Sequence, residues 1–592
     1  MRFVWAVAAL VLATVMIGAG IAQRTVFQVP DVVSETLPLE GDAPFVLIDG
    51  EVLRAQPGTQ TLSIDGDGEV VAAYGRTADL EQWLSPTEYL RVEASAEGEP
   101  TSDMQKATYT PAEGAEAPVL DPRGSDLWLD EFSREGTLEA TLQLPEGMSV
   151  LVATDGTAPA AEQITVSWPS GLTTPWAGPL IVGGALMLLA GIVLYILALR
   201  HMRRSRGPRR KGSPGIAAPE PEAIEGGAEK GVISASPSRL RLSRGRRALL
   251  TVPALLTVGA LATGCAPDAW PEFESTPTPS ATESVIIPEG QGAPAVTETQ
   301  ADRILARIAE QTAAADEARD AAAAAVRLDG PALAERQTSY RLLASVPDET
   351  PLAPIPASPR TALLPQAYDG WPRSFLAVVE EASGSATVMT VTQQDPWSDY
   401  KLNHLAGLAP TATMNLAAPY VGAVAVLPNS PFLVLPPNQV ATAYADVLDK
   451  GDASPYAELF DAASDPFRAQ VAEKRAEQLS VFNQTGASTG QLTFAATPGA
   501  GEPVSLVTLD SGAIVAVTVN ETDSVTPVNE DAVIKADANP RVSTLAGATQ
   551  SKTGFSTVYA DQLFFFVPAQ GSNEPIQLLA YRSNILDAKV VN

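Results

Sequence analysis

Three long runs of apolar residues interrupt an otherwise mixed pattern along the chain. The first run, residues 3–22, follows a single charged residue, Arg2. The second, residues 176–199, is uncharged and long enough to cross about 30 Å of hydrocarbon. The third, residues 248–262, is shorter and contains Pro253. We predict a transmembrane signal anchor at 1–22, with a cleaved signal peptide as the alternative, a transmembrane helix at 175–199, and a third apolar membrane segment at 248–264.

The positive charges predict how these segments are oriented. Residues 200–247 hold thirteen Lys and Arg but four Asp and Glu, and short basic loops stay on the cytoplasmic side. This segment is also rich in Gly and Pro, so we expect a disordered cytoplasmic loop. Both large regions, 23–174 and the chain beyond residue 264, are then outside the cytoplasm at the cell membrane. The residues taken as topology determinants are Arg203, Arg204, Arg206, Arg209, Arg210, Arg246 and Arg247.

Residues 23–174 alternate apolar and polar positions over short stretches separated by Gly, Asp and Pro. This spacing is typical of an all-β domain, sandwich-like or barrel-like. One helical turn is expected at 79–84.

Residues 265–298 are rich in Pro, Thr and Ser and predict an extended tether. Residues 299–592 begin with helical patterns and end in a β meander, which predicts an α+β domain. The Asp395-Pro396 pair indicates a short helix that continues to Leu405. The order of helices and strands occurs twice, at about 300–436 and 437–592. It resembles a tandem of cystatin-like or nuclear-transport-factor-like units, in which a curved sheet wraps a helix.

Composition excludes several classes of function. The net charge is −30, and nucleic-acid binding needs concentrated Lys and Arg. One Cys and two His exclude a disulfide framework and most metal sites. We therefore expect no cofactor and no nucleic-acid partner; the expected partners are membrane lipids and an envelope protein.

Cys265 ends the third apolar run, after Leu261-Ala262-Thr263-Gly264 and an Arg-rich stretch. This arrangement resembles a bacterial lipoprotein signal, in which a peptidase cuts before the Cys and the thiol is lipidated. Cys265 is therefore the lipidation candidate. The family usually has Leu where this chain has Ala262, and the signal is internal here. The alternative is a short third membrane helix with an incidental Cys.

Two patterns are candidates for chemistry. Ser398 and Lys401 fit S-x-x-K, and Lys552-Thr553-Gly554 fits K-T-G, which together resemble penicillin-binding proteins. No S-x-N lies between them, so a solvated helix face is the simpler interpretation.

Acidic residues suggest two further sites. Asp65, Asp67 and Glu69 alternate as calcium ligands do, although a hairpin turn explains them as well. Asp126, Asp130 and Glu131 near Trp128 form an acidic aromatic patch expected at an exposed edge, where it could bind a carbohydrate or cation.

The stretches 371–379 and 392–402, with 73–83 and 124–132, resemble a family of uncharacterised actinobacterial membrane proteins. The resemblance implies a cell type and a topology, and no activity. We expect a membrane-anchored, extracytoplasmic, non-enzymatic binding or assembly protein of the cell envelope. One alternative is a cell-wall acyl enzyme using Ser398 and Lys401. Another is a lipoprotein-type binder of a small apolar ligand, with a cavity lined by residues such as Phe375, Phe564 and Phe565.

Overall fold

The computed structural model describes residues 2–25, 32–111, 116–169, 176–204, 292–381, 384–410 and 412–592. The chain divides into two compact units. One contains the two apolar helices, and the other contains residues 34–168 together with the C-terminal region. The third apolar run, Cys265 and the basic segment beyond Arg204 lie outside the described residues.

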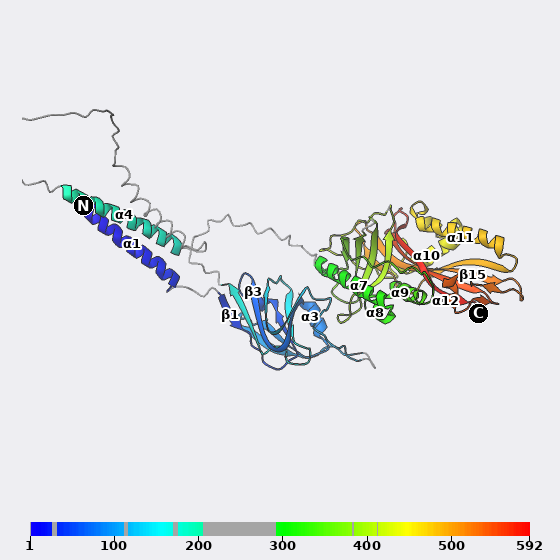
Figure 1. The fold of residues 1–592 in the computed structure, drawn as a ribbon, viewed down its shortest axis with the longest axis horizontal. Helices are drawn as coiled ribbons and strands as arrows, with labels where there is room; N and C mark the ends of the chain where they lie inside the picture. The colour runs from blue at the N-terminus through cyan, green and yellow to red at the C-terminus, as the bar shows by residue number, and fades with distance from the viewer. Residues whose placement is uncertain are drawn as a thin grey trace, which may run out of the picture. The chain divides into compact units, whose positions relative to one another are not determined.

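Two helices, α1 (Arg2–Thr25) and α4 (Ala177–Arg204), are long and apolar enough to cross a membrane. They coincide with the first two apolar runs of the sequence. Figure 1 shows them side by side. The ring of Phe3 lies 5.7 Å from that of Tyr195, whereas Gly20 faces Ala177 and Ile181. The two helices are therefore antiparallel.

Small residues at intervals of seven positions allow the backbones of α1 and α4 to approach each other closely. A Cβ on Gly184 would approach the Ile17 side chain to 2.6 Å and the Ala13 carbonyl oxygen to 3.1 Å. Small residues permit close backbone approach between apolar helices, while the large apolar side chains face outward. The buried small residues along the contact are Ala6, Ala13, Gly20, Ala177, Gly184, Gly191 and Ala198.

Residues 32–169 form one eight-stranded sheet with two short helices, α2 (Gly50–Leu53) and α3 (Thr77–Leu84). The region is mostly β, as predicted, but its strands join in a single sheet rather than in the two sheets of a sandwich. The sheet order is β1-β8-β3-β7-β2-β4-β5, with β6 paired to β3. The strands are β1 (Val32–Thr36), β2 (Phe45–Asp49), β3 (Gln60–Arg76), β4 (Tyr89–Ala94), β5 (Pro100–Gln105), β6 (Asp130–Leu142), β7 (Met148–Ala153) and β8 (Gln163–Pro169).

Strand β3 bends this sheet. Its register with β6 shifts between Asp65 and Glu69; the first half of β3 also pairs with β8 and the second half with β7. Gly68 has a positive φ of 84° at the bulge, a conformation that glycine adopts without strain. The residues around Asp67 are thus a bulge within one strand, and the predicted hairpin is wrong.

The first half of the C-terminal region has three helices followed by a four-stranded meander. Its helices are α7 (Glu298–Ala318), α8 (Ala321–Arg327) and α9 (Gly330–Leu343). Its strands are β9 (Arg360–Pro365), β10 (Arg373–Glu380), β11 (Ala386–Gln393) and β12 (Lys401–Leu408). Val296, inside the predicted tether, is buried in this half.

The helix predicted from Asp395 to Leu405 is wrong. The Asp395 carboxylate accepts hydrogen bonds from the backbone N–H groups of Trp397 and Ser398, as a helix cap would. The chain makes only that turn, because residues 401–408 then pair with β11 as strand β12.

The second half repeats the order of helices and then strands. Helices α10 (Pro437–Lys450) and α11 (Pro466–Thr485) precede the main strands, and a small hairpin with a short helix interrupts them. The main strands are β13 (Gly490–Pro498), β14 (Val504–Val507), β15 (Ala513–Pro527), β18 (Phe555–Val567) and β19 (Gln577–Val590). The interruption consists of β16 (Ile534–Lys535), α12 (Pro540–Ala546) and β17 (Gln550–Ser551).

The strands of both halves join in one sheet that folds back on itself. The halves meet where β12 pairs with β19 through two residue pairs. Two strands separate β12 from β15 along the sheet, yet His404 Nε2 on β12 lies 3.2 Å from Thr518 Oγ1 on β15. The two half-sheets therefore pack face to face. Helices α7–α9 and α10–α11 lie on opposite sides of them (Figure 1).

Helix α9 of the first half also contacts the second half, through the buried carboxylate of Glu335. This carboxylate accepts hydrogen bonds from Gln562 (2.9 Å) on β18 and from Arg582 (2.7 Å) and Asn584 on β19. All three donors belong to the second half. The halves therefore form one folded body.

The bent sheet of residues 34–168 packs against helices α7 and α8 and against the residues that flank β10 and β12. Asp126 and Trp128, predicted at an exposed edge, are each 1% exposed. The prediction is wrong for these two residues, since Arg327 of α8 pairs with the Asp126 carboxylate at 2.5 Å, whereas Asp130 is exposed and Glu131 is half-buried. The second unit is thus one assembly of the β region and the C-terminal region.

His404 generates a first prediction. Burial lowers the pKa of His404 to about 4, so the native state holds it neutral while the unfolded chain is protonated below about pH 6.5. The unfolded state then binds more protons, and stability falls as pH drops from about 6.5 to 4. Replacing His404→Gln should reduce this loss, by up to roughly 3 kcal/mol at pH 4.

The measurement is thermal unfolding of the full chain at pH 7 and pH 4.5. Thr390→Val removes the 3.4 Å contact to His404 Nδ1 but keeps the titrating ring, so it should keep the acid sensitivity. Equal acid sensitivity of His404→Gln and the parent chain would contradict the prediction.

Candidate functional site

A groove lies beneath helix α11, between this helix and the sheet of the second half. Asp465 caps the start of α11 by accepting a hydrogen bond from Arg468 N at 2.8 Å. Only Phe467 and Val471, near that start, are buried. The rest of α11 extends over strands β13, β15 and β18, and the space beneath it has a volume of about 720 Å³. This volume lies within the range of sites that hold small molecules.

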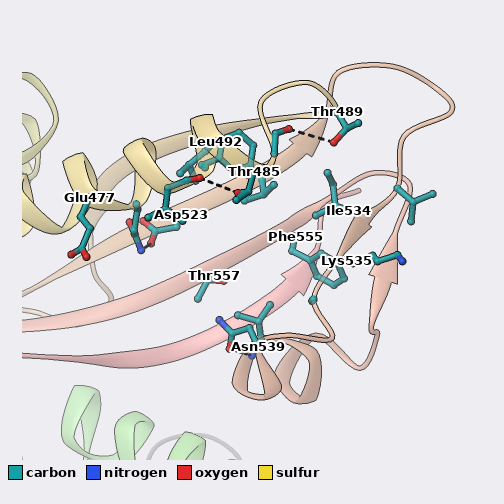
Figure 2. Close-up of a pocket in the computed structure, with 18 of the residues that line it drawn as sticks. Glu477, Thr485, Thr489, Leu492, Asp523, Ile534, Lys535, Asn539, Phe555 and Thr557 are labelled. Atoms are coloured by element: carbon teal, nitrogen blue, oxygen red, sulfur yellow. Dashed lines mark hydrogen bonds between the residues drawn. The ribbon is translucent and has the colours of Figure 1, made fainter.

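The groove has an apolar floor and a far wall formed by the β16–α12 segment. In Figure 2, Phe555, Thr557 and Ile534 surround the space below α11, and Asn539 stands at the beginning of α12. The apolar lining residues are Val481, Phe482, Leu492, Val525, Val533, Ile534, Ala536, Val542 and Phe555.

Hydrogen-bond acceptors gather at the end of the groove nearer the start of α11. Gln478 Nε2 donates to Asp523 Oδ2 at 3.1 Å. The remaining oxygens of this pair, Gln478 Oε1 and Asp523 Oδ1, are buried and have no hydrogen-bond partner among the described residues. Buried acceptors without donors are costly. Glu477 also lines this end. A ligand that occupied this end would have to supply hydrogen-bond donors to Gln478 Oε1 and Asp523 Oδ1.

A buried charged cluster lies next to this end of the groove. Glu521, 1% exposed, is 3.2 Å from Arg475 and 3.6 Å from Lys474 of α11. The Lys474 ammonium also lies 3.8 Å from the centre of the Tyr559 ring. Burial, together with the charges of Asp523 and Glu521, raises the pKa of Tyr559 to about 12.

Asp561 is fully buried beside this cluster. Burial, reinforced by the nearby Glu521 carboxylate, raises its pKa to about 8, although Ser583 and the cations Lys474 and Arg475 lower it in part. The side chain of Asp561 is therefore largely protonated at pH 7.

A second cavity of about 750 Å³ lies beside the first half of the sheet. Its polar lining atoms include Asn403 Oδ1 and Ser505 Oγ, which are buried and without partners among the described residues. These groups are neutral. Asp329 and Glu502 also line this cavity. The groove beneath α11 differs in that one of its unpartnered buried acceptors, Asp523 Oδ1, is a carboxylate oxygen, and in that Leu479 and Val481 of its helix are 42% and 55% exposed.

The residues singled out from the sequence lie away from the groove. Lys401 begins β12, and its ammonium donates to the carbonyl of Ala325 at 2.7 Å. Ser398 lies in the turn capped by Asp395. The aromatic residues expected to line a cavity, Phe375, Phe564 and Phe565, are fully buried in packed cores instead.

The candidate cation ligands lie apart from the groove on β3. Asp65 accepts a hydrogen bond from Thr137 at 2.7 Å, and Glu69 is 3.7 Å from Arg123. No cluster of three His, Cys, Asp or Glu suited to a metal occurs in the described ranges. Arg203 and Arg204 end α4, while the other predicted topology residues and Cys265 are outside the described part.

The sequence interpretation missed the groove residues. One feature of the sequence indicates the groove: in α11, apolar residues such as Leu479, Val481 and Phe482 do not lie on one face of the helix. A helix that cannot bury all its apolar residues on one side leaves some of them beside a space or in solvent.

The buried carboxyl of Asp561 generates a second prediction. Between about pH 4 and 8 the native state binds a proton that the unfolded chain has lost, so this group makes stability fall as pH rises through that window. Asp561→Asn cannot ionise. Its stability relative to the parent chain should therefore be greater at pH 8 than at pH 5, by at least about 1 kcal/mol.

Denaturant unfolding of the full chain at both pH values measures this difference. Val519→Ala, at the position paired with Asp561 across β15 and β18, removes packing but keeps the titrating group, so its effect should be the same at both pH values. A difference for Asp561→Asn that does not change with pH would refute the assignment.

Comparison with known proteins gives one match. The model of a family described as a domain of unknown function (DUF8094) matches residues 292–590. No curated protein and no solved structure matches the chain.

Proposed function

Because the chain belongs to the DUF8094 family, whose model covers half of it and assigns no activity, we propose a function from the groove itself. The protein is a membrane-anchored binding protein of the cell envelope, and the groove beneath α11 holds a small ligand. The ligand has an apolar body, which lies on the floor near Phe555 and Leu492. Its head is a protonated amine, which donates to Gln478 Oε1 and Asp523 Oδ1.

The unpaired acceptors carry this proposal. An apolar ligand alone would leave both oxygens buried without donors, and a carboxylate head would add repulsion from Asp523 and Glu477. An ammonium supplies three donors and the opposite charge.

The proposed location is the cell membrane, with both folded regions outside the cytoplasm. The antiparallel packing of α1 and α4 supports two crossings, since both ends of the β region then emerge on one side. The buried contacts between the β region and the C-terminal region support a topology with those two regions on the same side of the membrane. The chain would then cross again between residues 205 and 291, and the apolar run at 248–262 is the candidate.

The finer proposals follow the repeated element order. Helices precede an antiparallel meander in both halves of the C-terminal region, which supports two nuclear-transport-factor-like units. The actinobacterial source and the lipidation of Cys265 remain proposals based on the sequence.

The ligand proposal is tested with three probes of one size: 3-phenylpropylamine, 3-phenylpropanol and 3-phenylpropanoate. We expect the amine to bind the full chain in lipid nanodiscs most tightly, as measured by calorimetry against empty nanodiscs. Asp523→Asn should weaken amine binding about tenfold or more, because a charge-assisted hydrogen bond is lost, with little change for the alcohol.

Two variants serve as controls for these measurements. Asp531→Asn makes the same charge change at an exposed residue outside the lining and should leave the amine affinity unchanged. Leu492→Trp fills the groove and should abolish binding of every probe. Failure of all three probes to bind the parent chain would overturn the groove as a binding site, whereas equal binding of amine and acid would overturn the amine head alone.

The topology is tested by cysteine labelling in intact cells. In a Cys265→Ala background, single changes Glu97→Cys and Asp531→Cys should react with a membrane-impermeant maleimide. Ser213→Cys should react only after lysis. Labelling of Ser213→Cys in intact cells, or protection of either of the other two, would contradict the proposed orientation.

A further inference from the structure

The contact between the β region and the C-terminal region has the features of an interface between two separate proteins. We infer that the β region, residues 34–168, is a permanent partner of the C-terminal region, and that the two stay bound in a one-to-one complex when the chain is cut between residues 205 and 291. This inference is independent of the ligand proposed for the groove.

A buried cluster of charges around Asp126 forms the first part of the interface. The Asp126 side chain is fully buried, and its carboxylate accepts from Arg327 at 2.5 Å and Arg307 at 3.0 Å. It also accepts from the backbone N–H of Tyr400 at 2.9 Å. The acid belongs to the β region, and every one of these donors belongs to the C-terminal region.

A second ion pair of the same kind lies around Asp79, at the start of α3. Arg373, the first residue of β10, is 0% exposed, and its Nη2 donates to Asp79 Oδ1 at 2.6 Å. The other oxygen of Asp79 accepts from Arg76 at 2.8 Å. The Arg373 guanidinium also donates to the carbonyls of Asp369 and Gly370, and these bonds orient it toward the β region.

Aromatic packing connects the two ion pairs. Trp371 and Trp397 of the C-terminal region pack against the apolar cluster of the β region that contains Trp83 and Trp128. Trp397 Nε1 donates to the carbonyl of Trp83 at 2.9 Å. Trp371 and Trp397 are half-buried, and Trp is enriched among the residues that contribute most to binding energy in protein interfaces.

Polar contacts from α7 complete the surface. The amide of Gln300, 7% exposed, donates to the carbonyl of Leu127 at 3.0 Å. Arg303 donates to the carbonyl of Leu129 at 3.0 Å. These donors bind backbone carbonyls of the loop before β6, and the hydrogen bonds fix the position of this loop along α7.

Separation would break both ion pairs between the regions: Asp126 would lose Arg307 and Arg327, and Arg373 would lose Asp79, which would keep only Arg76. Within the assembled interface, reversing one member of such a pair is strongly unfavourable, because the partner charge then stays buried without compensation. The ion pairs, the aromatic packing and the polar contacts of α7 all join the two regions directly, whereas a covalent linker only raises the effective concentration of one for the other.

The test uses the full chain with a protease site placed between Gly226 and Gly227 and a tag at the C-terminus. After purification in mild detergent and cleavage, the N-terminal piece should remain with the tagged piece through size-exclusion chromatography. Separation of the two pieces of the parent chain would overturn the inference.

A charge-reversal variant distinguishes this interface from association through the detergent or the apolar helices. Asp79→Arg combined with Asp126→Arg should lose most of the co-eluting piece, with binding weakened about a hundredfold or more. Continued co-elution of this variant would also overturn the inference. Adding Arg373→Asp and Arg327→Asp restores opposite charges, and recovery of co-elution would exclude simple misfolding.

Discussion

The pairing of Asp126 with Arg327 is the contact on which the arrangement of the second unit depends. A carboxylate without solvent exposure is tolerable only with compensating charge and donors, and all of them come from the other region of the chain. The loop that carries Asp126 is fixed by this requirement, and so are the helix that carries Arg327 and the turn before β12. The β region and the C-terminal region thus acquire one relative position.

This arrangement separates the roles of the different parts. The antiparallel helices use their small residues to contact each other, and their large apolar side chains face outward, as a lipid environment favours. The β region and the first half of the C-terminal region are joined by buried ion pairs between Asp79 or Asp126 and arginines of the other region. The second half keeps an overhanging helix and a groove with unpaired acceptors. In the second half, the unpaired acceptors thus lie beside a space that packing leaves unfilled.

Sequence patterns predicted the apolar helices, most strands and the repeated order of helices and strands, because these follow from local periodicity. They failed where a distant partner decided the outcome. Asp395-Pro396 has the chemistry of a helix start, but pairing with β11 turned the next residues into a strand. Asp126 is indistinguishable in sequence from a solvated acid, because Arg327 lies two hundred residues away. The groove was missed for the same reason: its wall combines α11, β18 and the α12 segment, which only the folded sheet brings together.

The carboxylate of Glu335 imposes an order in time as well as in space. It resides in the first half, yet its three side-chain donors are in β18 and β19, among the last strands to be synthesised. A ribosome delivers the N-terminal end first, so Asp126 is synthesised before Arg307 and Arg327, and Glu335 is synthesised before its three donors. The C-terminal region therefore completes the contact at Glu335 only once β18 and β19 have been synthesised.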